Sequence, residues 1–209
     1  MDRIGIGLLG YGTVGSGVGK LLKKNAEDIT LATGKEVSLR RVLERDPAFS
    51  HPGLDPALVT IRFEDIIEDP EIQIVVELIG GTGAAKDFLL EAIRNGKSVV
   101  TANKALLAEC GPEIMHAVAE KGVDIGFEAS VGGGIPWLHN LSRTKRADDI
   151  LSICGIMNGT TNYILYNMER KDIEFADALK QAQELGYAEA NPSADIDGLD
   201  AQHKCAISA

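Results

Sequence analysis

The chain has 209 residues, of which 44% are hydrophobic and 25% charged, and its formal net charge is −10. This composition predicts a globular protein with one large domain or two modest ones. The acidic balance argues against a nucleic-acid-binding surface, which needs clustered positive charge to displace counterions from phosphates. A membrane is also not expected as a partner, because no apolar run approaches the roughly 20 residues of a bilayer-spanning helix.

The start of the chain and its cysteines bear on the compartment. Met1-Asp2-Arg3 runs directly into a short apolar segment and lacks the pattern of a secretory signal, so we expect a cytoplasmic protein. The three cysteines are odd in number and widely spaced, which predicts buried, reduced thiols rather than a disulfide framework or a zinc site. They are Cys110, Cys154 and Cys205.

Short apolar runs alternate with helical patterns over the first half of the chain. Residues 88–93 follow helical spacing before a stop at Asn95-Gly96, and a second helix is expected from about Pro112 to Lys121, ending at Gly122. The alternation is typical of βαβ units and predicts an α/β fold, a Rossmann-type doubly wound parallel sheet, over residues 1–130. The expected strands are Ile4 to Leu9, Val37 to Leu43, Ile74 to Leu78, Ser98 to Thr101 and Asp124 to Phe127.

The glycine-rich passage from Val131 to Pro136 marks the expected domain boundary. Residues 131–209 are predicted to form a second domain of the α+β class. The expected elements are a helix through Trp137 to Leu141, a strand from Ile150 to Ile156, helices from Thr160 to Glu169 and from Phe175 to Leu185, the latter closed by Gly186, and a helix from Leu199 onward.

Gly10-Tyr-Gly12-Thr-Val-Gly15 is a G-x-G-x-x-G motif between an apolar strand and a helical stretch. The first glycine permits a tight turn, the second lets the backbone approach a pyrophosphate, and the third lets helix and strand pack closely. The helix N-terminus then faces the anion. The alternative is a glycine-rich turn that binds nothing, but the βαβ context favours a dinucleotide site.

The end of the second strand bears on the choice between NAD and NADP. An acidic residue there accepts a hydrogen bond from the ribose 2′-hydroxyl of NAD, whereas an arginine accommodates the 2′-phosphate of NADP. Glu44-Arg45 offers both, and an ordinary solvated ion pair is the alternative. Because Arg40 and Arg41 add positive charge beside Arg45, we favour NADP over NAD.

Two further loops are expected beyond the carboxyl ends of strands, where open α/β sheets bind ligands. Gly80-Gly-Thr82-Gly83 suggests a second phosphate-facing loop. Thr101-Ala-Asn103-Lys104 follows the next strand and would direct an amine into the crevice. A surface lysine that opens a helix is an equal alternative for Lys104.

Near the end of the chain, Asp200 and Lys204 share one helix face at i and i+4. On their own they suit an ordinary solvated pair better than a site. Asn158-Gly-Thr-Thr-Asn162 also allows two interpretations, a helix start capped by Thr160 or Thr161 and a binding site for a substrate carboxylate.

These motifs together resemble the homoserine dehydrogenase family over essentially the whole chain. The resemblance rests on residues 7–15, 101–108, 128–136, 158–164 and 195–204. It implies reversible, nicotinamide-dependent interconversion of L-homoserine and L-aspartate 4-semialdehyde, a step toward threonine, methionine and isoleucine. It also implies a homodimer, and a chain that continues well beyond the point matching Ala209. Residues 131–209 would then be a partial α+β domain for substrate binding and dimerisation, so we expect a catalytically incomplete piece.

The resemblance assigns roles to individual residues. Lys204 matches the lysine that donates and accepts the proton at the substrate oxygen, and Lys104 matches a second lysine that contacts cofactor and substrate. Glu189 and Asp200 match the acidic groups that hold the substrate, whose ammonium group needs anionic oxygens. The expected pocket neighbours are Tyr187 and Thr160. The candidate cofactor-binding residues are Gly10, Gly12, Thr13, Val14, Gly15, Arg45, Thr82, Lys104 and Gly186.

The resemblance also implies a monovalent cation, typically sodium, bound by Glu128 and the backbone of Val131, Gly133 and Ile135. One carboxylate and several backbone carbonyls would make a hard oxygen cage, and a plain turn is the alternative.

Three other functions compete with this interpretation. Aspartate-semialdehyde dehydrogenase chemistry would require an activated cysteine, and none of the three has an evident partner base in the sequence. An NAD(P)-binding sensor module would explain the glycine motif, but it would not explain why Lys104, Glu189 and Lys204 occur together. A catalytically incomplete fragment would bind cofactor without turnover.

Overall fold

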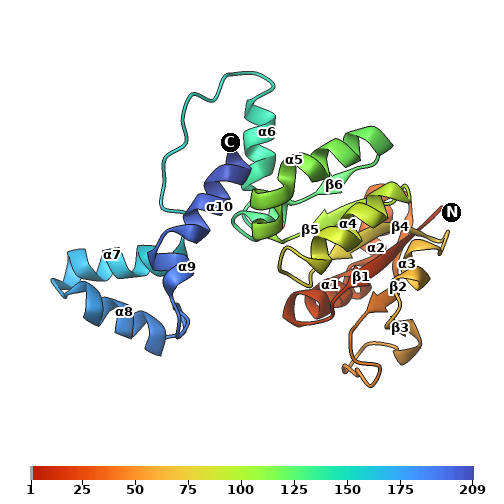
Figure 1. Ribbon diagram of the computed structural model, residues 1–209, viewed down its shortest axis with the longest axis horizontal. Coiled ribbons are helices and arrows are strands. Elements are labelled where there is room, and N and C mark those ends of the chain that lie inside the picture. The colour runs from red at the N-terminus through yellow and green to blue at the C-terminus, as the bar shows by residue number, and fades with distance from the viewer. Residues whose placement is uncertain (1) are drawn as a thin grey trace. The chain divides into compact units, whose positions relative to one another are not determined.

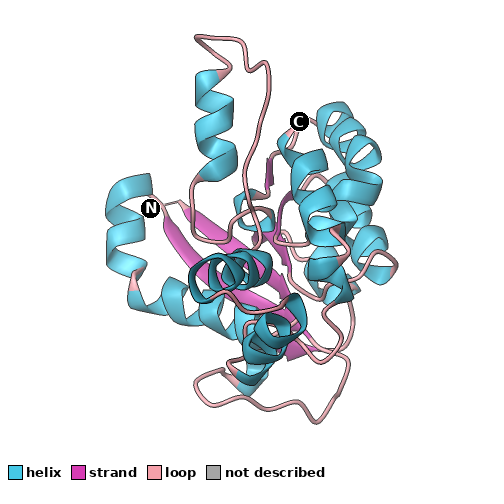
Figure 2. Cartoon of the chain, turned by 90° about the vertical axis from the view of Figure 1, so that its left-hand side faces the viewer, coloured by secondary structure: helices cyan, strands magenta, loops and turns pink. Residues whose placement is uncertain are grey.

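The computed structural model describes residues 2–209. The chain divides into two compact units, Met1–Ser130 and Val131–Ala209 (Figure 1). All strands of the described residues belong to the first unit, and the regular structure of the second is helical (Figure 2). Among the described residues, no helix has both the length and the apolar character that a bilayer span requires.

The first unit is built on a six-stranded sheet in the order β3-β2-β1-β4-β5-β6, with every neighbouring pair parallel. The strand order reverses between β1 and β4, and in such sheets a ligand binds beyond the carboxyl ends of the strands at that point. The predicted doubly wound sheet is confirmed. Its strands are β1 (Arg3–Leu9), β2 (Glu36–Leu43), β3 (Val59–Thr60), β4 (Ile72–Glu77), β5 (Ser98–Thr101) and β6 (Ile125–Gly126).

All five predicted strands are present, and β3 was not predicted because two residues carry no periodic signal. Connecting helices alternate with the strands. They are α1 (Thr13–Lys24), α2 (Ala26–Thr33), η1 (Pro56–Leu58), α3 (Glu64–Ile67), α4 (Ala84–Arg94), α5 (Lys104–Lys121) and η2 (Glu128–Ser130).

The predicted start of α5 near Pro112 is wrong. The helix begins at Lys104 and continues through Pro112, where the ring nitrogen has no hydrogen to donate. The side chain of Asn103 accepts a hydrogen bond from the backbone N–H of Leu106 at 3.1 Å and so caps the true start. The cap, rather than the proline, therefore defines where α5 begins.

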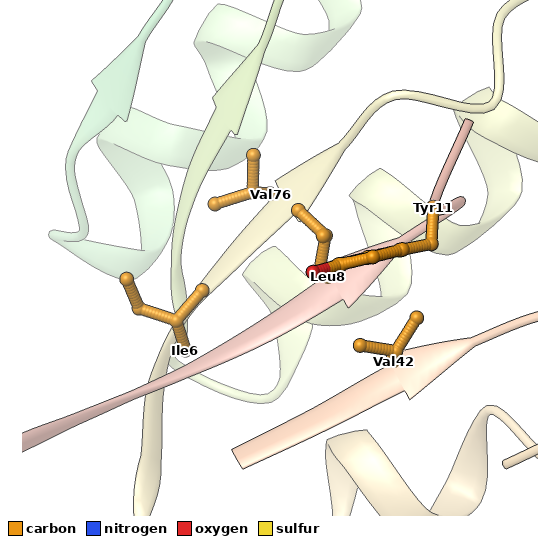
Figure 3. Packing of buried hydrophobic residues seen from close by; sticks show 5 residues of the cluster. All are labelled: Ile6, Leu8, Tyr11, Val42 and Val76. Atoms are coloured by element: carbon orange, nitrogen blue, oxygen red, sulfur yellow. The ribbon is translucent and has the colours of Figure 1, made fainter. Parts of the chain in front are cut away.

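A cluster of buried side chains fixes the glycine turn to the sheet. Ile6 and Leu8 of β1, Val42 of β2 and Val76 of β4 pack with Tyr11 of the turn (Figure 3). Leu8 and Val42 have no exposed surface, and Tyr11 is 5% exposed. The core of the unit therefore lies directly beneath the turn that follows β1.

A buried lysine, Lys97, links the start of β4 to the start of β5, at the amino ends of the strands. The Lys97 Nζ donates to the backbone carbonyls of Asp69 at 2.9 Å and Ile72 at 2.7 Å. Burial lowers the pKa of the Lys97 ammonium below its ordinary value. This lysine acts at the start of the strands, away from the carboxyl edge.

The second unit contains α6 (Trp137–Thr144), α7 (Gly159–Lys171), α8 (Phe175–Glu184), α9 (Ser193–Ile196) and α10 (Leu199–Ser208). Helices α7 and α8 pack around Ile164, Ala178 and Ala182, as expected from their apolar spacing. The predicted strand from Ile150 to Ile156 is wrong, so the strand content expected of an α+β domain is absent from the described residues. A strand needs a paired neighbour, and this segment has none there.

Candidate functional site

The glycine turn after β1 has the geometry that dinucleotide binding requires. Gly10 has a φ of +88°, which an L side chain rarely adopts, and its N–H donates to the carbonyl of Leu43 at 3.0 Å. A Cβ at Gly15 would collide with the carbonyl oxygen of Gly10, so α1 can pack this closely only with a glycine there. A Cβ at Gly12 would meet nothing within 4 Å. The turn is thus closed toward the protein and open toward a ligand.

Helix α1 begins at Thr13 and Val14, directly after Gly12, and no side chain caps its N-terminus. Its first-turn N–H groups carry the positive end of the helix dipole. Together with the open surface at Gly12, they fit the pyrophosphate of a dinucleotide.

The two candidate residues at the end of β2 have different surroundings. The Glu44 carboxylate accepts a hydrogen bond from the backbone N–H of Tyr11 at 2.5 Å, so it is held against the glycine turn. Arg45 is exposed. The carboxylate therefore has a structural partner, whereas the guanidinium is accessible to a ligand.

Two further loops lie at the same edge of the sheet, because β1, β4 and β5 are neighbours in the parallel order. Thr82 is half-buried in the loop after β4, and Lys104 is half-buried as the first residue of α5. The two loops are joined by a hydrogen bond from the Asn103 side chain to the carbonyl of Gly81, at 2.6 Å. The structure thus brings the predicted cofactor-binding residues of the first unit to one edge.

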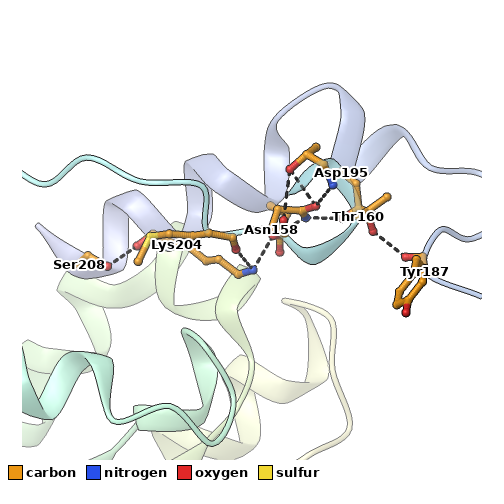
Figure 4. Close-up of polar contacts among 9 residues, drawn as sticks. Asn158, Thr160, Tyr187, Asp195, Lys204 and Ser208 are labelled. Carbon is orange, nitrogen blue, oxygen red and sulfur yellow. Dashed lines mark hydrogen bonds and ion pairs between the residues drawn. The ribbon is translucent and has the colours of Figure 1, made fainter. Parts of the chain in front are cut away.

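In the second unit, Asp200 and Lys204 form an ion pair on α10 that is largely shielded from solvent; Lys204 is labelled in Figure 4. The Lys204 Nζ lies 2.7 Å from the Asp200 Oδ2, and the two side chains are 16% and 5% exposed. The same Nζ donates to the backbone carbonyl of Met157 at 2.5 Å. An ordinary solvated pair, the plainer interpretation of this spacing, is therefore not what the fold contains.

Asn158 connects this pair to the start of α7. Its Nδ2 donates to the Asp200 Oδ2 at 2.9 Å and to the Asp195 Oδ1 at 2.7 Å. Its Oδ1 accepts from the backbone N–H of Thr161 at 2.8 Å. Asn158 thus uses both ends of its amide at the junction of α7, α9 and α10.

The expectation that Thr160 or Thr161 caps α7 is wrong. Asn158 lies immediately before the first helical residue, so its carboxamide oxygen reaches the N–H of Thr161. Thr160 instead donates its hydroxyl hydrogen to the backbone carbonyl of Tyr187 at 2.6 Å. The Tyr187 ring stacks on that of Tyr163, with centroids 4.8 Å apart.

A cavity of about 520 Å³ lies beside the ion pair, entirely within the second unit. Lys204 lines it, together with Asn158 and Asn162, among mostly apolar neighbours. The other lining residues are Val131, Gly132, Ile135, Trp137, Ile153, Cys154, Gly155, Ile156, Met157 and Gly159. The cavity offers the Lys204 amine and the Asn162 amide to a small polar molecule, because the Asn158 amide is already engaged within the protein.

None of the four predicted substrate-binding residues lines this cavity; they are Thr160, Tyr187, Glu189 and Asp200. Asp200 is buried next to Lys204, whereas Gly186, Tyr187 and Glu189 lie on an exposed segment after α8. The backbone carbonyl of Glu189 accepts from the Gln183 side chain at 3.1 Å, which fixes the segment to α8.

The predicted cation ligands lie on either side of Ser130 along the chain. Glu128 is in η2, and Gly132 and Gly133 form a tight turn with φ values of +82° and +59°. The N–H of Ile135 donates to the carbonyl of Gly132 at 3.1 Å. Within the described residues, no group of three histidine, cysteine or acidic side chains could hold a metal ion.

The cysteines of the described chain are all unpaired with one another, as predicted. Their expected burial is wrong for Cys154 and Cys205, which are exposed, and Cys110 is only half-buried. The prediction rested only on the general tendency of free cysteines to be buried, and that tendency does not determine the burial of a single residue.

Sequence reasoning missed three polar residues that organise these sites: Glu77, Asn158 as a side-chain partner of the ion pair, and Asp195. Asn158 could have been found, because an asparagine directly before a helix start is a preferred cap. Glu77 gave a weaker signal, a single acidic residue ending an otherwise apolar strand.

The fold and its glycine turn define a dinucleotide-binding Rossmann domain, followed by a helical unit with a buried lysine-carboxylate pair. The family model described as "Homoserine dehydrogenase, NAD binding domain" matches residues 10–128, and the model described as "Homoserine dehydrogenase" matches residues 136–209. The chain belongs to the homoserine dehydrogenase family, and its first unit is a nicotinamide-dinucleotide-binding domain.

Individual relatives agree with this assignment. The homoserine dehydrogenase of Bacillus subtilis (strain 168) is 43% identical over 208 residues, covering 99% of this chain and 48% of the relative. The crystal structure of a homoserine dehydrogenase from Thiobacillus denitrificans has a TM-score of 0.88 at 48% identity, covering 98% of this chain and 47% of that one.

A hyperthermophilic archaeal homoserine dehydrogenase, solved in complex with NADPH, has a TM-score of 0.81 at 25% identity. The match covers 98% of this chain and 68% of the archaeal one. The chain spans about half the length of the curated relatives it matches.

The glycine turn yields a matched set of substitutions. Gly12→Ala should leave the free energy of unfolding within about 1 kcal/mol but weaken NADPH binding at least tenfold, because the methyl group occupies the open surface. Gly15→Ala should destabilise the fold by about 1–3 kcal/mol through overpacking. Urea unfolding and a fluorescence titration with NADPH measure the two effects.

Gly17→Ala is the control, since a Cβ there also meets nothing within 4 Å but lies further along α1. It should change neither quantity adversely. Unaltered NADPH affinity in Gly12→Ala would contradict the placement of the pyrophosphate at this turn.

Proposed function

We propose that the full protein is a homoserine dehydrogenase, which interconverts L-homoserine and L-aspartate 4-semialdehyde with a nicotinamide cofactor. The observation that carries this proposal is the buried Asp200–Lys204 pair beside a cavity, in a chain whose other unit is a nicotinamide-dinucleotide-binding domain. The full protein would act in the threonine, methionine and isoleucine pathways. A homodimer and a cytoplasmic location stay predictions.

Lys204 has the chemistry that the reaction needs. When bound, the nicotinamide ring accepts the hydride from the alcohol carbon or returns it to the aldehyde carbon. As the alcohol loses its hydride it also loses its hydroxyl proton, which the Lys204 amine accepts, and in the reducing direction the ammonium donates that proton to the aldehyde oxygen.

The contacts of Lys204 prepare the amine for this role. An ammonium group has three N–H donors, and within the described residues Asp200 and Met157 take two of them. The third is then available to a substrate oxygen. Asp200 holds the amine in place and, in our proposal, joins Glu189 in binding the substrate ammonium, with Thr160 and Tyr187 as neighbours.

We also propose that Lys104, in the first unit, is a residue that contacts cofactor and substrate. Its place as the first residue of α5, behind the Asn103 cap, gives its backbone a fixed position at the carboxyl edge of the sheet. The cap supports this role because it restricts where the amine can reach.

Replacing Lys204 tests the proposal. In the full protein, Lys204→Ala should lower kcat for homoserine oxidation at least 100-fold, the usual scale for loss of a general acid-base group, with NADPH affinity unchanged. Lys204→Arg keeps the charge beside Asp200 but should be similarly slow, because a guanidinium does not give up its proton. Steady-state kinetics and a fluorescence titration with NADPH provide both readouts.

Lys180→Ala is the matched control, an exposed lysine of α8 in the same unit, and should retain turnover. The proposed role of Lys204 fails if Lys204→Ala oxidises homoserine at the native rate. If turnover were instead lost in Cys154→Ser, the competing cysteine chemistry would be favoured, since Cys154 lines the cavity. NADPH binding without any turnover of the native full protein would favour a sensor.

We propose NADP as the preferred cofactor, with Arg45 receiving the 2′-phosphate. The exposed guanidinium at the end of β2 supports this, as does the NADPH bound by the similar archaeal enzyme. Arg45→Ala should raise KM for NADP by roughly tenfold, equivalent to one lost charge-assisted contact of about 1.4 kcal/mol, and leave KM for NAD unchanged. Arg94→Ala, an exposed arginine of α4, is the control. An equal effect of Arg45→Ala on both cofactors would count against this preference.

We also propose a sodium site formed by Glu128 and the backbone carbonyls of Val131, Gly133 and Ile135. The all-oxygen donor set and the tight glycine turn support it. Replacing sodium by tetramethylammonium at constant ionic strength should lower the turnover of the full protein severalfold, and Glu128→Gln should abolish the difference between the two salts. Identical rates of the native protein in both salts would argue against the site.

A further inference from the structure

We propose that Glu77 is a positioning residue, which holds the loops after β4 and β5 in the arrangement that binds the nicotinamide cofactor. The inference rests on the proposed cofactor-dependent function and adds a residue to it. Glu77 ends β4 at the carboxyl edge of the sheet and is fully buried. It lies in the first unit, as do all the residues on which the argument depends.

The Glu77 carboxylate is the centre of the hydrogen bonding at this edge. Its Oε1 accepts from the backbone N–H groups of Ile79 at 2.9 Å and Gly80 at 3.0 Å. Its Oε2 accepts from the Thr101 hydroxyl at 2.6 Å. One oxygen therefore shapes the loop after β4, and the other reaches the last residue of β5.

Asn103 closes these contacts into a ring. Its backbone N–H donates to the Thr101 hydroxyl oxygen at 3.0 Å, and its side-chain amide donates to the carbonyl of Gly81 at 2.6 Å. The ring thus runs from Glu77 through Thr101 and Asn103 to Gly81, and back along the chain through Gly80. The loop after β4 and the loop after β5 are therefore joined to each other by hydrogen bonds at two places.

The ring defines the backbone that a dinucleotide would meet. Gly80 and Gly81 both have a φ of +74°, a conformation that would relax readily without its hydrogen bonds. Lys104 follows Asn103 directly. Because β4 lies beside β1, this backbone also adjoins the glycine turn at the carboxyl edge.

The cost of burying Glu77 argues for a purpose beyond stability. The partners of its carboxylate among the described residues are two backbone N–H groups and a hydroxyl, with no cation among them. Desolvating a carboxylate is expensive, and apolar residues of similar size often serve stability as well or better. A carboxylate can, however, bind two separate segments at once, which no apolar side chain can do.

Glu77→Gln tests this role, because it keeps the shape of the side chain but replaces one acceptor oxygen by a donor. The amide nitrogen can then only donate to the Thr101 hydroxyl oxygen, so the hydroxyl hydrogen loses its carboxylate acceptor and the charge-assisted link of the ring is weakened. We expect Kd for NADPH to rise at least tenfold and KM for the cofactor to rise with it, while KM for homoserine changes less than twofold. Glu91→Gln, an exposed residue of α4, is the control and should bind NADPH normally.

Thr101→Val provides a second variant that breaks the ring without touching the carboxylate, should Glu77→Gln fold poorly. Each variant is titrated with NADPH at a temperature where urea unfolding shows it to be native. The double variant should weaken binding by less than the product of the two single effects, because both break the same ring.

Native NADPH affinity in folded Glu77→Gln or Thr101→Val, with only stability reduced, would overturn the positioning role and leave a structural one. This result is separable from failure of the proposed function. If the native full protein bound NADPH but did not oxidise homoserine, the affinity comparison would still decide the role of Glu77.

Discussion

The first unit depends on one close approach, between the start of α1 and the end of β1. The backbone at Gly15 lies so near the carbonyl of Gly10 that no side chain fits between them. This contact places the N-terminus of α1 directly over the carboxyl edge of the sheet. Tyr11 then packs into the core below, and its N–H is held by Glu44. The dinucleotide site is therefore a consequence of how a helix is packed on a strand.

Two buried carboxylates, Glu77 and Asp200, position the groups that the proposed chemistry needs, and each positions a different kind of group. Glu77 accepts from neutral donors and joins two loops, so its charge shapes backbone. Asp200 accepts from an ammonium and an amide, so its charge fixes a reactive side chain. Both are costly to bury. Glu77 fixes the loops after β4 and β5, and Asp200 fixes the amine of a long lysine side chain.

The sequence predicted best what is local and periodic. The five predicted strands and the glycine turn depend on neighbouring residues, and all are present. Pro112 was misleading, because a proline usually ends a helix but can be tolerated inside one whose start is well capped. Residues 150–156 have the apolar pattern of a strand. A strand also needs a neighbouring strand to pair with, and the sequence of one segment does not show whether such a neighbour exists.

The candidate sites show the same limit at the level of single side chains. The spacing of Asp200 and Lys204 predicted that they could meet, because i and i+4 positions share a helix face. It could not predict their burial, which depends on residues far away in the sequence. Met157 lies 47 residues before Lys204, and Asn158 lies 42 residues before Asp200. Burial is what separates this pair from a solvated one, since exposed pairs are screened and mobile. The chemistry at Lys204 is thus specified jointly by α10 and by the loop that enters α7, and only the fold brings the two together.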